Sequence, residues 1–226
     1  MDGNGRWAKL RGMPRTFGHK AGAKAFRKTV ENCLERNIEI LTVYAFSTEN
    51  WKRPKEEVDS IMKLLGEYLD EAFNNEAKNT DICVKILGDK TALSPKLQEK
   101  IKNIEEKTKK NTKITVNIAL NYGGRDELVR GFKDLAMQIM QGKLNVDEIT
   151  EEKISSSLYT AGQLDPDLII RPSGELRLSN FLIWQAAYSE FVFMNVLWPD
   201  FGAKELDEAL EEYAKRNRRF GAVDVK

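Results

Sequence analysis

The sequence predicts one α/β domain in which helices flank a mostly parallel central sheet. Short apolar segments rich in β-branched residues alternate along the chain with longer segments of helical periodicity, a pattern typical of repeated βαβ units. The 226 residues are enough to bury the sizeable core that such a domain needs. Because no repeat, low-complexity tract or linker interrupts the pattern, we expect a single domain over residues 1–226.

Five segments are predicted to be strands because they are short, apolar and bounded by polar or glycine-rich sequence. They are Ile38–Phe46, Ile82–Leu87, Ile114–Leu120, Leu168–Ile170 and Phe191–Asn195. Three of these strands run directly into polar clusters, at residues 47–51, 121–125 and 171–175. In an open parallel sheet ligands bind beyond the carboxyl ends of the strands, so we expect a binding site at this edge.

One helix is predicted directly after Pro54, because apolar residues recur every three or four positions and two glutamates occupy its first turn. Its apolar positions are Val58, Ile61, Met62, Leu65 and Leu69. Similar periodicity predicts the remaining helices at Ala21–Arg36, Pro95–Lys110, Asp126–Gln141, Glu151–Tyr159, Phe181–Tyr188 and Lys204–Arg219.

The charge balance argues against a polyanionic partner. The chain has 36 Lys or Arg and 35 Asp or Glu, a net charge of +1, so no long-range attraction for nucleic acid is expected. Its two cysteines, Cys33 and Cys83, lack metal-ligand or redox spacing and are expected as reduced core thiols in the cytoplasm. No apolar run approaches the ~18 residues of a membrane span and no signal peptide is recognisable, so we expect a soluble protein.

The chain opens with a glycine-rich motif, residues 1–7, that suits an anion. Gly3 and Gly5 let backbone N–H groups approach an anion closely, and Arg6 and Arg15 can add charge-assisted hydrogen bonds to phosphate oxygens. Asp2 would repel a phosphate unless it holds a divalent cation, and magnesium is usually bound through one or two carboxylates. An ordinary glycine turn with solvated charges is the alternative interpretation of this motif.

The same motif also matches the dinucleotide pattern Gly3-x-Gly5-x-x-Ala8, which makes a nicotinamide-dependent oxidoreductase a rival hypothesis. An isolated match is weak evidence. The pattern requires a strand before its first glycine and an acidic residue at the end of the next strand. The sequence has no strand before Gly3, and its first predicted strand ends with Phe46-Ser47.

The second cluster, residues 47–54, mixes hydroxyls, an amide, an indole and a cation between a strand and a helix. Such a mixture suits a ligand with a polar head and an apolar body, because Trp51 can pack on carbon while Asn50 and Arg53 bind oxygen. Core packing of Trp51 is the alternative.

The third cluster, residues 165–180, contains Arg171 and Arg177 on either side of a tight turn, with Ser179 close behind. This arrangement suits a second anion clamp, unless Glu175 pairs with the arginines in a structural ion network. Two anion sites and a carboxylate for a metal favour group transfer between two phosphorylated substrates. The sequence lacks a nucleophile elbow and a P-loop, and His19 is its single histidine, which disfavours a hydrolytic triad and a nucleotide-driven enzyme.

Taken together, the motifs resemble the cis-prenyltransferase family, and within it the bacterial undecaprenyl diphosphate synthases (isoprenyl transferases). The resemblance runs from Met1 to Gly221. Its motifs are Met1–Ala8, Gly18-His19, Tyr44–Pro54, Asn121–Arg125, Ile170–Phe181, Leu197–Phe201 and Arg218–Gly221. The all-helical trans-prenyltransferases bind metal through Asp-Asp-x-x-Asp motifs, and the sequence contains no Asp-Asp pair.

The resemblance implies a Mg²⁺-dependent transferase that adds isopentenyl diphosphate in cis to an allylic diphosphate. In it, Asp2 would coordinate magnesium, Glu190 would be a second metal ligand, and Asn50 would assist loss of a proton. The allylic diphosphate would contact Gly3, Asn4, Gly5, Arg6, Arg15 and His19, and isopentenyl diphosphate would contact Arg171, Arg177, Leu178 and Ser179. Trp7, Ser47, Thr48, Glu49, Trp51 and Arg53 would complete the walls of the substrate site.

The resemblance also implies a homodimer, in which the tail motif Arg219-Phe220-Gly221 reaches the partner's site. The allylic substrate would be farnesyl diphosphate and the product undecaprenyl diphosphate, the lipid carrier precursor for cell-wall synthesis, with peripheral membrane contact through that product. A short-chain cis-prenyltransferase and a non-catalytic subunit of a larger complex are the alternatives. A channel for the growing chain is expected beside Tyr44, Met62, Leu65, Leu69, Ile86 and Ile118, unless these residues are ordinary core.

The sequence departs from the family pattern in two places. Family members usually carry an apolar strand before the first motif, and without it Asp2 would hang from a free terminus. Pro172 stands where the family more often has threonine, and proline lacks a backbone N–H, so the neighbouring clamp is expected to bind slightly differently.

Overall fold

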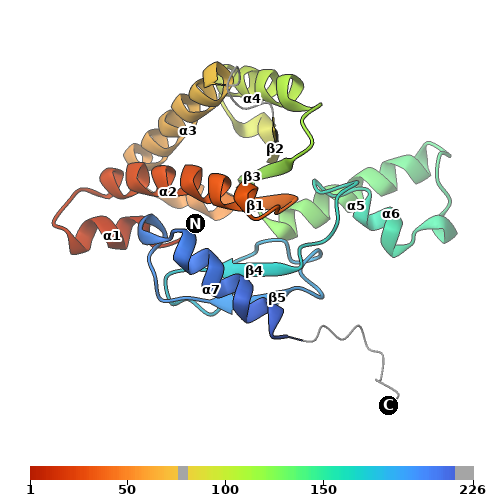
Figure 1. Cartoon of the computed structure of the whole chain (residues 1–226). Coiled ribbons are helices and arrows are strands. Elements are labelled where there is room, and N and C mark those ends of the chain that lie inside the picture. The colour runs from red at the N-terminus through yellow and green to blue at the C-terminus, as the bar shows by residue number, and fades with distance from the viewer. Residues whose placement is uncertain (76–80, 217–226) are drawn as a thin grey trace, which may run out of the picture.

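The fold consists of two small parallel sheets covered by helices, as seen in a computed structural model that describes residues 1–75 and 81–216. The larger sheet has the order β1-β3-β2, and the second sheet pairs β4 with β5 (Figure 1). The strands are β1 Ile40–Ser47, β2 Ile82–Leu87, β3 Ile114–Tyr122, β4 Leu168–Arg171 and β5 Glu190–Phe193. All five predicted strands are present, and all pairings are parallel as predicted.

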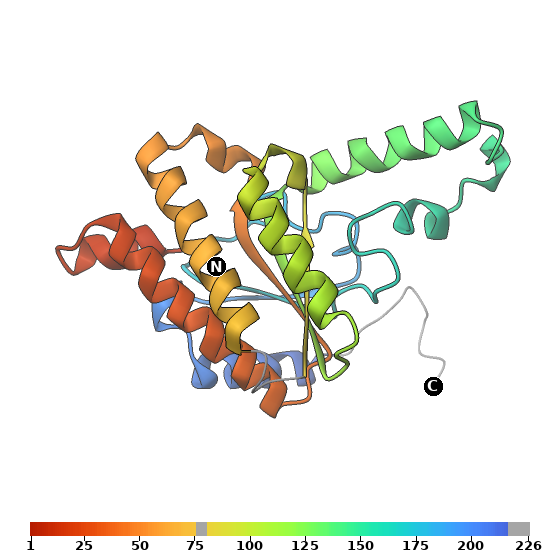
Figure 2. The same ribbon diagram turned by 90° about the horizontal axis from the view of Figure 1, so that it is seen from above.

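The helices cover both sheets and leave one arm projecting from the body. In Figure 2, α2, α3 and α4 lie across the larger sheet, whereas α7 packs against α2 and β5. Helices α5 and α6 extend away from the other elements (Figures 1 and 2). The helices are α1 Asn4–Leu10, α2 Arg15–Glu35, α3 Lys55–Asn75, α4 Pro95–Thr108, α5 Gly124–Met140, α6 Glu151–Ser155 and α7 Ala203–Ala214. Within the described residues, no helix has both the length and the apolar character needed to cross a membrane.

The helix predictions need correction in several places. Helix α2 begins at Arg15 rather than Ala21, and α7 ends at Ala214, before the predicted Arg219. The predicted helix Phe181–Tyr188 consists of turns, because the backbone is left-handed at Asn180 (φ 64°) and Leu182 (φ 46°). The predicted helix Glu151–Tyr159 ends at Ser155, where serine hydroxyls that follow donate to carbonyl groups of the last turn. Conversely, the glycine-rich first motif was not predicted to be helical, yet it forms most of α1.

A buried carboxylate joins the arm to the sheet. Glu127, in the first turn of α5, is 1% exposed and accepts hydrogen bonds from Tyr122 Oη (2.6 Å), Gln185 Nε2 (3.2 Å) and the Tyr159 N–H (2.7 Å). These donors come from the end of β3 and from two later loops. Glu127 therefore ties the start of α5 to the end of β3 and to the loops that contain Tyr159 and Gln185.

Close packing of α1 on α2 anchors the first motif. A Cβ atom at Gly18 would overlap the carbonyl oxygen of Asn4, so only glycine lets the two helices approach this closely. The Trp198 backbone N–H donates to the Asp2 carbonyl (3.0 Å) and its indole donates to the Gly22 carbonyl (2.8 Å). Asp2 is thus held by packing and hydrogen bonds rather than hanging free, which corrects the expectation from the sequence.

We expect Gly18→Ala to destabilise the protein by about 2–3 kcal/mol, because the added methyl group must displace the backbone of Asn4. The matched control is Gly66→Ala in α3, where a Cβ atom would meet only ordinary contacts, beginning 3.6 Å from Lys100 Nζ. That change should stabilise the helix by about 0.5–1 kcal/mol. Urea unfolding measures both, and equal stability of the two variants would contradict the packing argument.

Candidate active site

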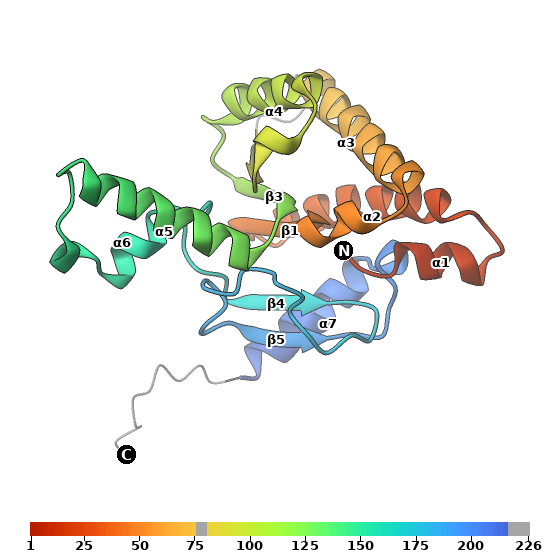
Figure 3. The same ribbon diagram turned by 180° about the vertical axis from the view of Figure 1, so that it is seen from behind.

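The glycine-rich first motif (residues 1–7) and the second and third clusters (residues 47–54 and 165–180) come together at the carboxyl ends of the strands, where a binding site was predicted. A cavity of about 930 Å³ opens among them and extends along β1 and β4. Figure 3 shows the N-terminus beside the end of the sheets toward which the β4 arrow points. The predicted site residues that line the cavity are Asp2, Gly3, Asn4, Gly5, Arg6, Arg15, His19, Ser47, Asn50, Arg53, Arg171, Arg177, Leu178 and Ser179.

Asp2 is surrounded by hydrogen-bond donors. Its Oδ1 accepts from the Gly3 N–H (2.6 Å) and lies 3.5 Å from Arg6 Nη2, and its Oδ2 accepts from Arg171 Nη2 (3.1 Å). Burial raises the pKa of Asp2, but hydrogen bonds from Arg171, Ser173 and the Gly3 N–H outweigh burial and hold this pKa below its ordinary value. Asp2 is therefore a carboxylate at neutral pH.

The arginines of the first and third motifs form one ion network. Arg6 donates to the Ser173 carbonyl (3.1 Å) and hydroxyl (2.7 Å) and lies 3.3 Å from Glu175, which also accepts from Arg177 (2.6 Å). Arg171 donates to Ser179 Oγ (2.8 Å) and to the Arg177 carbonyl. The ion-pair alternative for Glu175 is thus observed, and the two predicted anion sites adjoin each other.

A residue that the sequence analysis missed, Glu57 of α3, contacts the basic side chains that lie outside this network. Its Oε1 accepts from Arg53 (3.0 Å) and Arg15 (3.2 Å) and lies 3.4 Å from His19 Nε2. Burial raises the pKa of Glu57, but the charges of Arg15 and Arg53 outweigh it and lower this pKa. Burial is also the largest influence on His19 and lowers its pKa, although Glu57 opposes the shift. The single histidine is therefore neutral at pH 7 beside an ionised carboxylate.

The second cluster is a short 3₁₀ turn, Thr48–Lys52, that caps the end of β1. Asn50 Oδ1 accepts from the Ser47 N–H (3.1 Å), and Asn50 lines the cavity. The Trp51 indole donates to Asn121 Oδ1 (2.7 Å), and its ring makes a T-shaped contact with Phe46. Because Trp51 is 41% exposed, plain core packing does not describe it.

Asn180, also missed as a site residue, connects all the clusters that follow strands. Its Nδ2 donates to Glu49 (2.9 Å), its Oδ1 accepts from the Arg125 N–H (2.8 Å), and its carbonyl accepts from the Gly124 N–H (2.7 Å). The left-handed backbone of Asn180 makes these contacts possible. Its place within the third motif was the only available signal of this role.

Some predicted site residues lie apart from the cavity: Trp7, Thr48, Glu49, Trp51 and Glu190. The register pairs Glu190 with Leu168 and Phe193 with Arg171, so Glu190 lies at the opposite end of its sheet, about 10 Å along the strand. Its carboxylate accepts from Arg216 (2.9 Å) instead. Within the described residues of one chain, Glu190 and Asp2 are not brought together.

The channel prediction fits one residue only, Tyr44, which lines the cavity. The others pack in or against the hydrophobic core, as the alternative stated: Met62, Leu65, Leu69, Ile86 and Ile118. The cavity wall instead combines apolar side chains such as Leu41 and Phe201 with the facing edges of β1 and β4. Among the described strands, β1 pairs only with β3 and β4 only with β5.

Pro172 does not interrupt the hydrogen bonds of the second sheet. The Arg171 carbonyl accepts from the Met194 N–H (3.0 Å) and the Ser173 N–H donates to the Val196 carbonyl (2.7 Å), so β4 and the segment after it bond to the β5 side on both flanks of the proline. The N–H that proline lacks would face the other edge of β4. Pro172 therefore leaves the neighbouring arginine clamp in place.

The ionised Asp2 carboxylate, with arginines beside it that can hold phosphate oxygens, fits a hard cation held jointly with substrate oxygens. Among the described residues, no three His, Cys, Asp or Glu side chains gather as a metal site. Magnesium commonly needs only one or two carboxylates when phosphate oxygens supply other ligands. An ionised Asp2 between Arg6 and Arg171 meets that requirement.

The family of the chain follows from its match to known sequences. A model of the family described as "Putative undecaprenyl diphosphate synthase" matches residues 1–221. The chain is a cis-prenyltransferase family member. An isoprenyl transferase of Clostridium perfringens is 48% identical over 99% of this chain and 88% of its own length. The ditrans,polycis-undecaprenyl-diphosphate synthase ((2E,6E)-farnesyl-diphosphate specific) of Pasteurella multocida is 50% identical over 99% of this chain and 93% of its own length.

Solved structures of cis-prenyltransferases have the same fold. Lavandulyl diphosphate synthase from Lavandula x intermedia, in complex with dimethylallyl diphosphate, superposes with a TM-score of 0.94 at 35% identity, covering 98% of this chain and 95% of that one. A probable undecaprenyl diphosphate synthase from Campylobacter jejuni gives a TM-score of 0.78 at 41% identity, covering 90% and 93%. The predicted fold class is therefore confirmed.

We expect Glu57→Gln to lower the pKa of His19, because Glu57 is the neighbour that raises it against the effect of burial. His19 is the single histidine of the chain, so its ring resonances in an NMR titration of untagged protein are unambiguous. Glu56→Gln, which removes an exposed carboxylate one residue away, should leave that pKa unchanged. An unchanged titration of His19 in Glu57→Gln would show that Glu57 does not govern this cluster.

Proposed function

We propose that this protein is a magnesium-dependent undecaprenyl diphosphate synthase, which adds isopentenyl diphosphate units in cis to farnesyl diphosphate. The observation that carries the proposal is the position of one ionised carboxylate, Asp2, between two arginine clusters at the carboxyl end of a parallel sheet. Two anionic substrates can meet there with a cation between them. The 50% identity to a farnesyl-diphosphate-specific synthase over nearly the full chain supports the choice of substrates.

The side chains divide the reaction between two binding regions. Arg6, Arg15 and His19 would hold the allylic diphosphate, while Arg171, Arg177 and Ser179 would hold isopentenyl diphosphate. Magnesium bound at Asp2 would supply positive charge that stabilises the departing diphosphate. Asn50 lines the cavity and would assist loss of the proton. No covalent enzyme intermediate is required.

The alternatives are a short-chain enzyme, which would make a different product, and a non-catalytic subunit, which would make none. The structure of lavandulyl diphosphate synthase, which shares this fold, is a complex with dimethylallyl diphosphate. A short-chain enzyme is therefore the second candidate. A non-catalytic subunit is disfavoured because Asp2, Arg171 and Arg177 are all present. The chain is 35% identical to this synthase but 48–50% identical to the relatives from Clostridium perfringens and Pasteurella multocida. The higher identity to these relatives favours the long-chain reaction.

A homodimer is part of the proposal. Helix α5 exposes a row of apolar side chains on the projecting arm, at the spacing of one helix face: Val129 (51%), Phe132 (52%), Met137 (51%) and Met140 (87%). Such a row is typical of a protein interface. The tail motif Arg219-Phe220-Gly221, expected to reach the partner's site, lies outside the described residues.

The chain is also proposed to form a single domain and to act in the cytoplasm. One family model spanning residues 1–221 supports a single domain. Cys33 and Cys83 are buried free thiols, which supports a reducing cytoplasmic location.

The function is tested by magnesium-dependent incorporation of radiolabelled isopentenyl diphosphate into a C55 product from farnesyl diphosphate. We expect Asp2→Ala to lower turnover a few hundredfold, because one transition-state stabiliser is typically worth about 3–4 kcal/mol. Asp147→Ala, at an exposed carboxylate outside the cavity, is the control. Products of C15 or C20 only would favour the short-chain alternative, and no incorporation at all would overturn the proposal.

A reciprocal pair of variants tests the two binding regions. Arg177→Ala should weaken binding of isopentenyl diphosphate, and Arg15→Ala should weaken binding of the allylic substrate, each by about 1.5–3 kcal/mol or roughly ten- to a hundredfold. Arg177 suits this test better than Arg171, which also contacts Asp2. Steady-state KM values for both substrates measure the effect. If each variant weakened both substrates equally, the regions would be wrongly assigned.

The dimer is tested by placing a charge on the arm. Phe132→Glu should convert a dimer into a monomer in sedimentation velocity, because a buried unpaired carboxylate opposes association. Leu10→Glu changes a side chain that is 77% exposed at the other end of the molecule and should leave the dimer intact. A wild-type protein that sediments as a fully active monomer would refute this part of the proposal.

A further inference from the structure

The positive charge of the chain is concentrated at its beginning. Residues 1–30 contain eight Lys or Arg side chains and one carboxylate, that of Asp2, whereas the whole chain is almost balanced at 36 to 35. The rest of the protein is therefore net negative. The basic side chains are Arg6, Lys9, Arg11, Arg15, Lys20, Lys24, Arg27 and Lys28.

Large apolar side chains are exposed in the same segment, around the turn that joins α1 to α2. Leu10 is 77% exposed, Met13 43% and Phe17 53%. Lysines adjoin them, since Lys9 precedes Leu10 and Lys20 Nζ lies 5.9 Å from the Phe17 ring. We call residues 9–24 the hairpin tip. Lys9 and Lys24 are exposed and form no ion pair with any other described residue.

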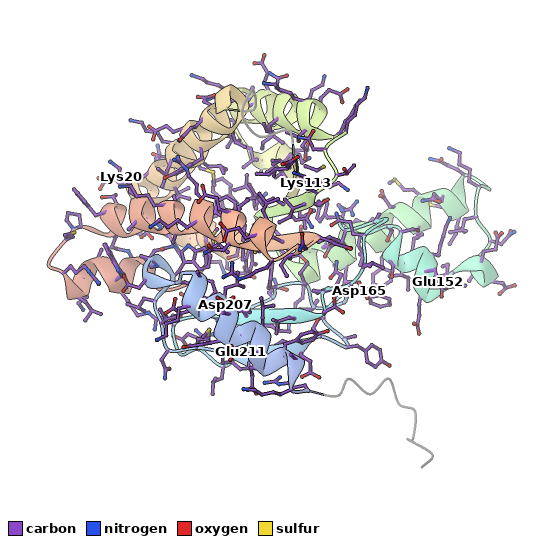
Figure 4. The ribbon with its side chains drawn as sticks, viewed as in Figure 1. Lys20, Lys113, Glu152, Asp165, Asp207 and Glu211 are labelled. Carbon is purple, nitrogen blue, oxygen red and sulfur yellow. The ribbon has the colours of Figure 1, made fainter. Side chains whose placement is uncertain are left out.

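The hairpin tip lies at one extremity of the molecule. Figures 1 and 2 show the turn between α1 and α2 at the end opposite to α5 and α6. Figure 4 shows Lys20 on the outer side of α2 near this turn. A projecting surface of this kind suits a flat partner better than a groove would, and it stays accessible when the α5 arm is covered.

We propose that the hairpin tip docks on an anionic lipid bilayer. Apolar side chains surrounded by lysines are the combination that binds membrane interfaces: the apolar groups enter the headgroup region while the cations attract anionic lipids. The inference rests on the proposed function in one respect, because a C55 polyprenyl product is a lipid that must pass from the enzyme into a bilayer.

The hairpin connects this surface directly to the candidate active site. Arg6 is in α1, Arg15 begins α2, and both line the cavity on the side proposed to hold the allylic diphosphate. Phe17 follows Arg15 by two residues. A tip seated on the bilayer therefore places the product's diphosphate near the membrane surface at release, the step that limits turnover in many enzymes.

The experiment is co-sedimentation of the full chain, without substrates, with vesicles of phosphatidylcholine alone or with phosphatidylglycerol. The wild type should bind the anionic vesicles more tightly. Lys9→Gln/Lys20→Gln/Lys24→Gln should weaken that binding by about a hundredfold, because each lysine near the surface contributes about fivefold. Lys96→Gln/Lys102→Gln/Lys110→Gln removes equal charge from exposed positions of and beside α4 and should bind nearly as well as wild type.

The apolar contribution is tested with Leu10→Ser/Met13→Ser/Phe17→Ser, which should lose about tenfold or more in binding. Val146→Ser, at an exposed valine on the arm, is its control. In steady-state assays anionic vesicles should accelerate wild type but not the hairpin-tip variants, while the first condensation stays equal in all.

The inference would be overturned if wild type ignored anionic vesicles or if the hairpin-tip variants bound as the controls do. A change of oligomeric state in these variants would identify the hairpin tip as a protein interface instead. Because binding is measured without substrates, an enzyme that makes the C55 product without binding vesicles would disprove the membrane surface and leave the proposed function standing.

Discussion

Mutual repulsion among guanidinium groups is the constraint that the candidate active site must satisfy. Arg6, Arg15, Arg53, Arg171 and Arg177 all line one cavity, and their charges repel one another strongly when partly shielded from water. Three carboxylates offset that repulsion: Asp2 pairs with Arg171, Glu57 with Arg15 and Arg53, and Glu175 with Arg6 and Arg177. Each carboxylate comes from a different segment, so the folded chain is what brings the charges into balance.

These pairs also determine what the site selects. A diphosphate must compete with carboxylates that already hold the arginines, so a weakly charged anion gains little by entering. Asp2 differs from the other two carboxylates because it stands between both arginine clusters and has a lowered pKa. A divalent cation there would turn the one repulsive group between two diphosphates into an attractive one.

The sequence allowed the strands and the edge of the site to be predicted, and most predicted site residues line the cavity, because strand ends and motif arginines are local features. Glu57 was missed because its partners Arg15 and His19 lie about 40 residues away, and a glutamate in a first helical turn is ordinary. The helix predicted at Phe181–Tyr188 was wrong because Asn180 adopts a left-handed backbone to serve three tertiary contacts. Periodicity carries no information on such contacts.

Because folding lowers the pKa of two carboxyl groups in the site, the stability that these groups contribute depends on pH. A carboxylate whose pKa is depressed by folding contributes stability that is complete above the unfolded pKa and is lost as pH falls through the folded one. Asp2 and Glu57 both belong to this class. At neutral pH their contribution is therefore fully present, and His19, with its pKa also lowered, adds no positive charge. The arginines thus remain paired throughout the neutral range. Protonation of Asp2 and Glu57 would release them only in acid. The core is less directly affected by acid, because apolar burial stabilises it.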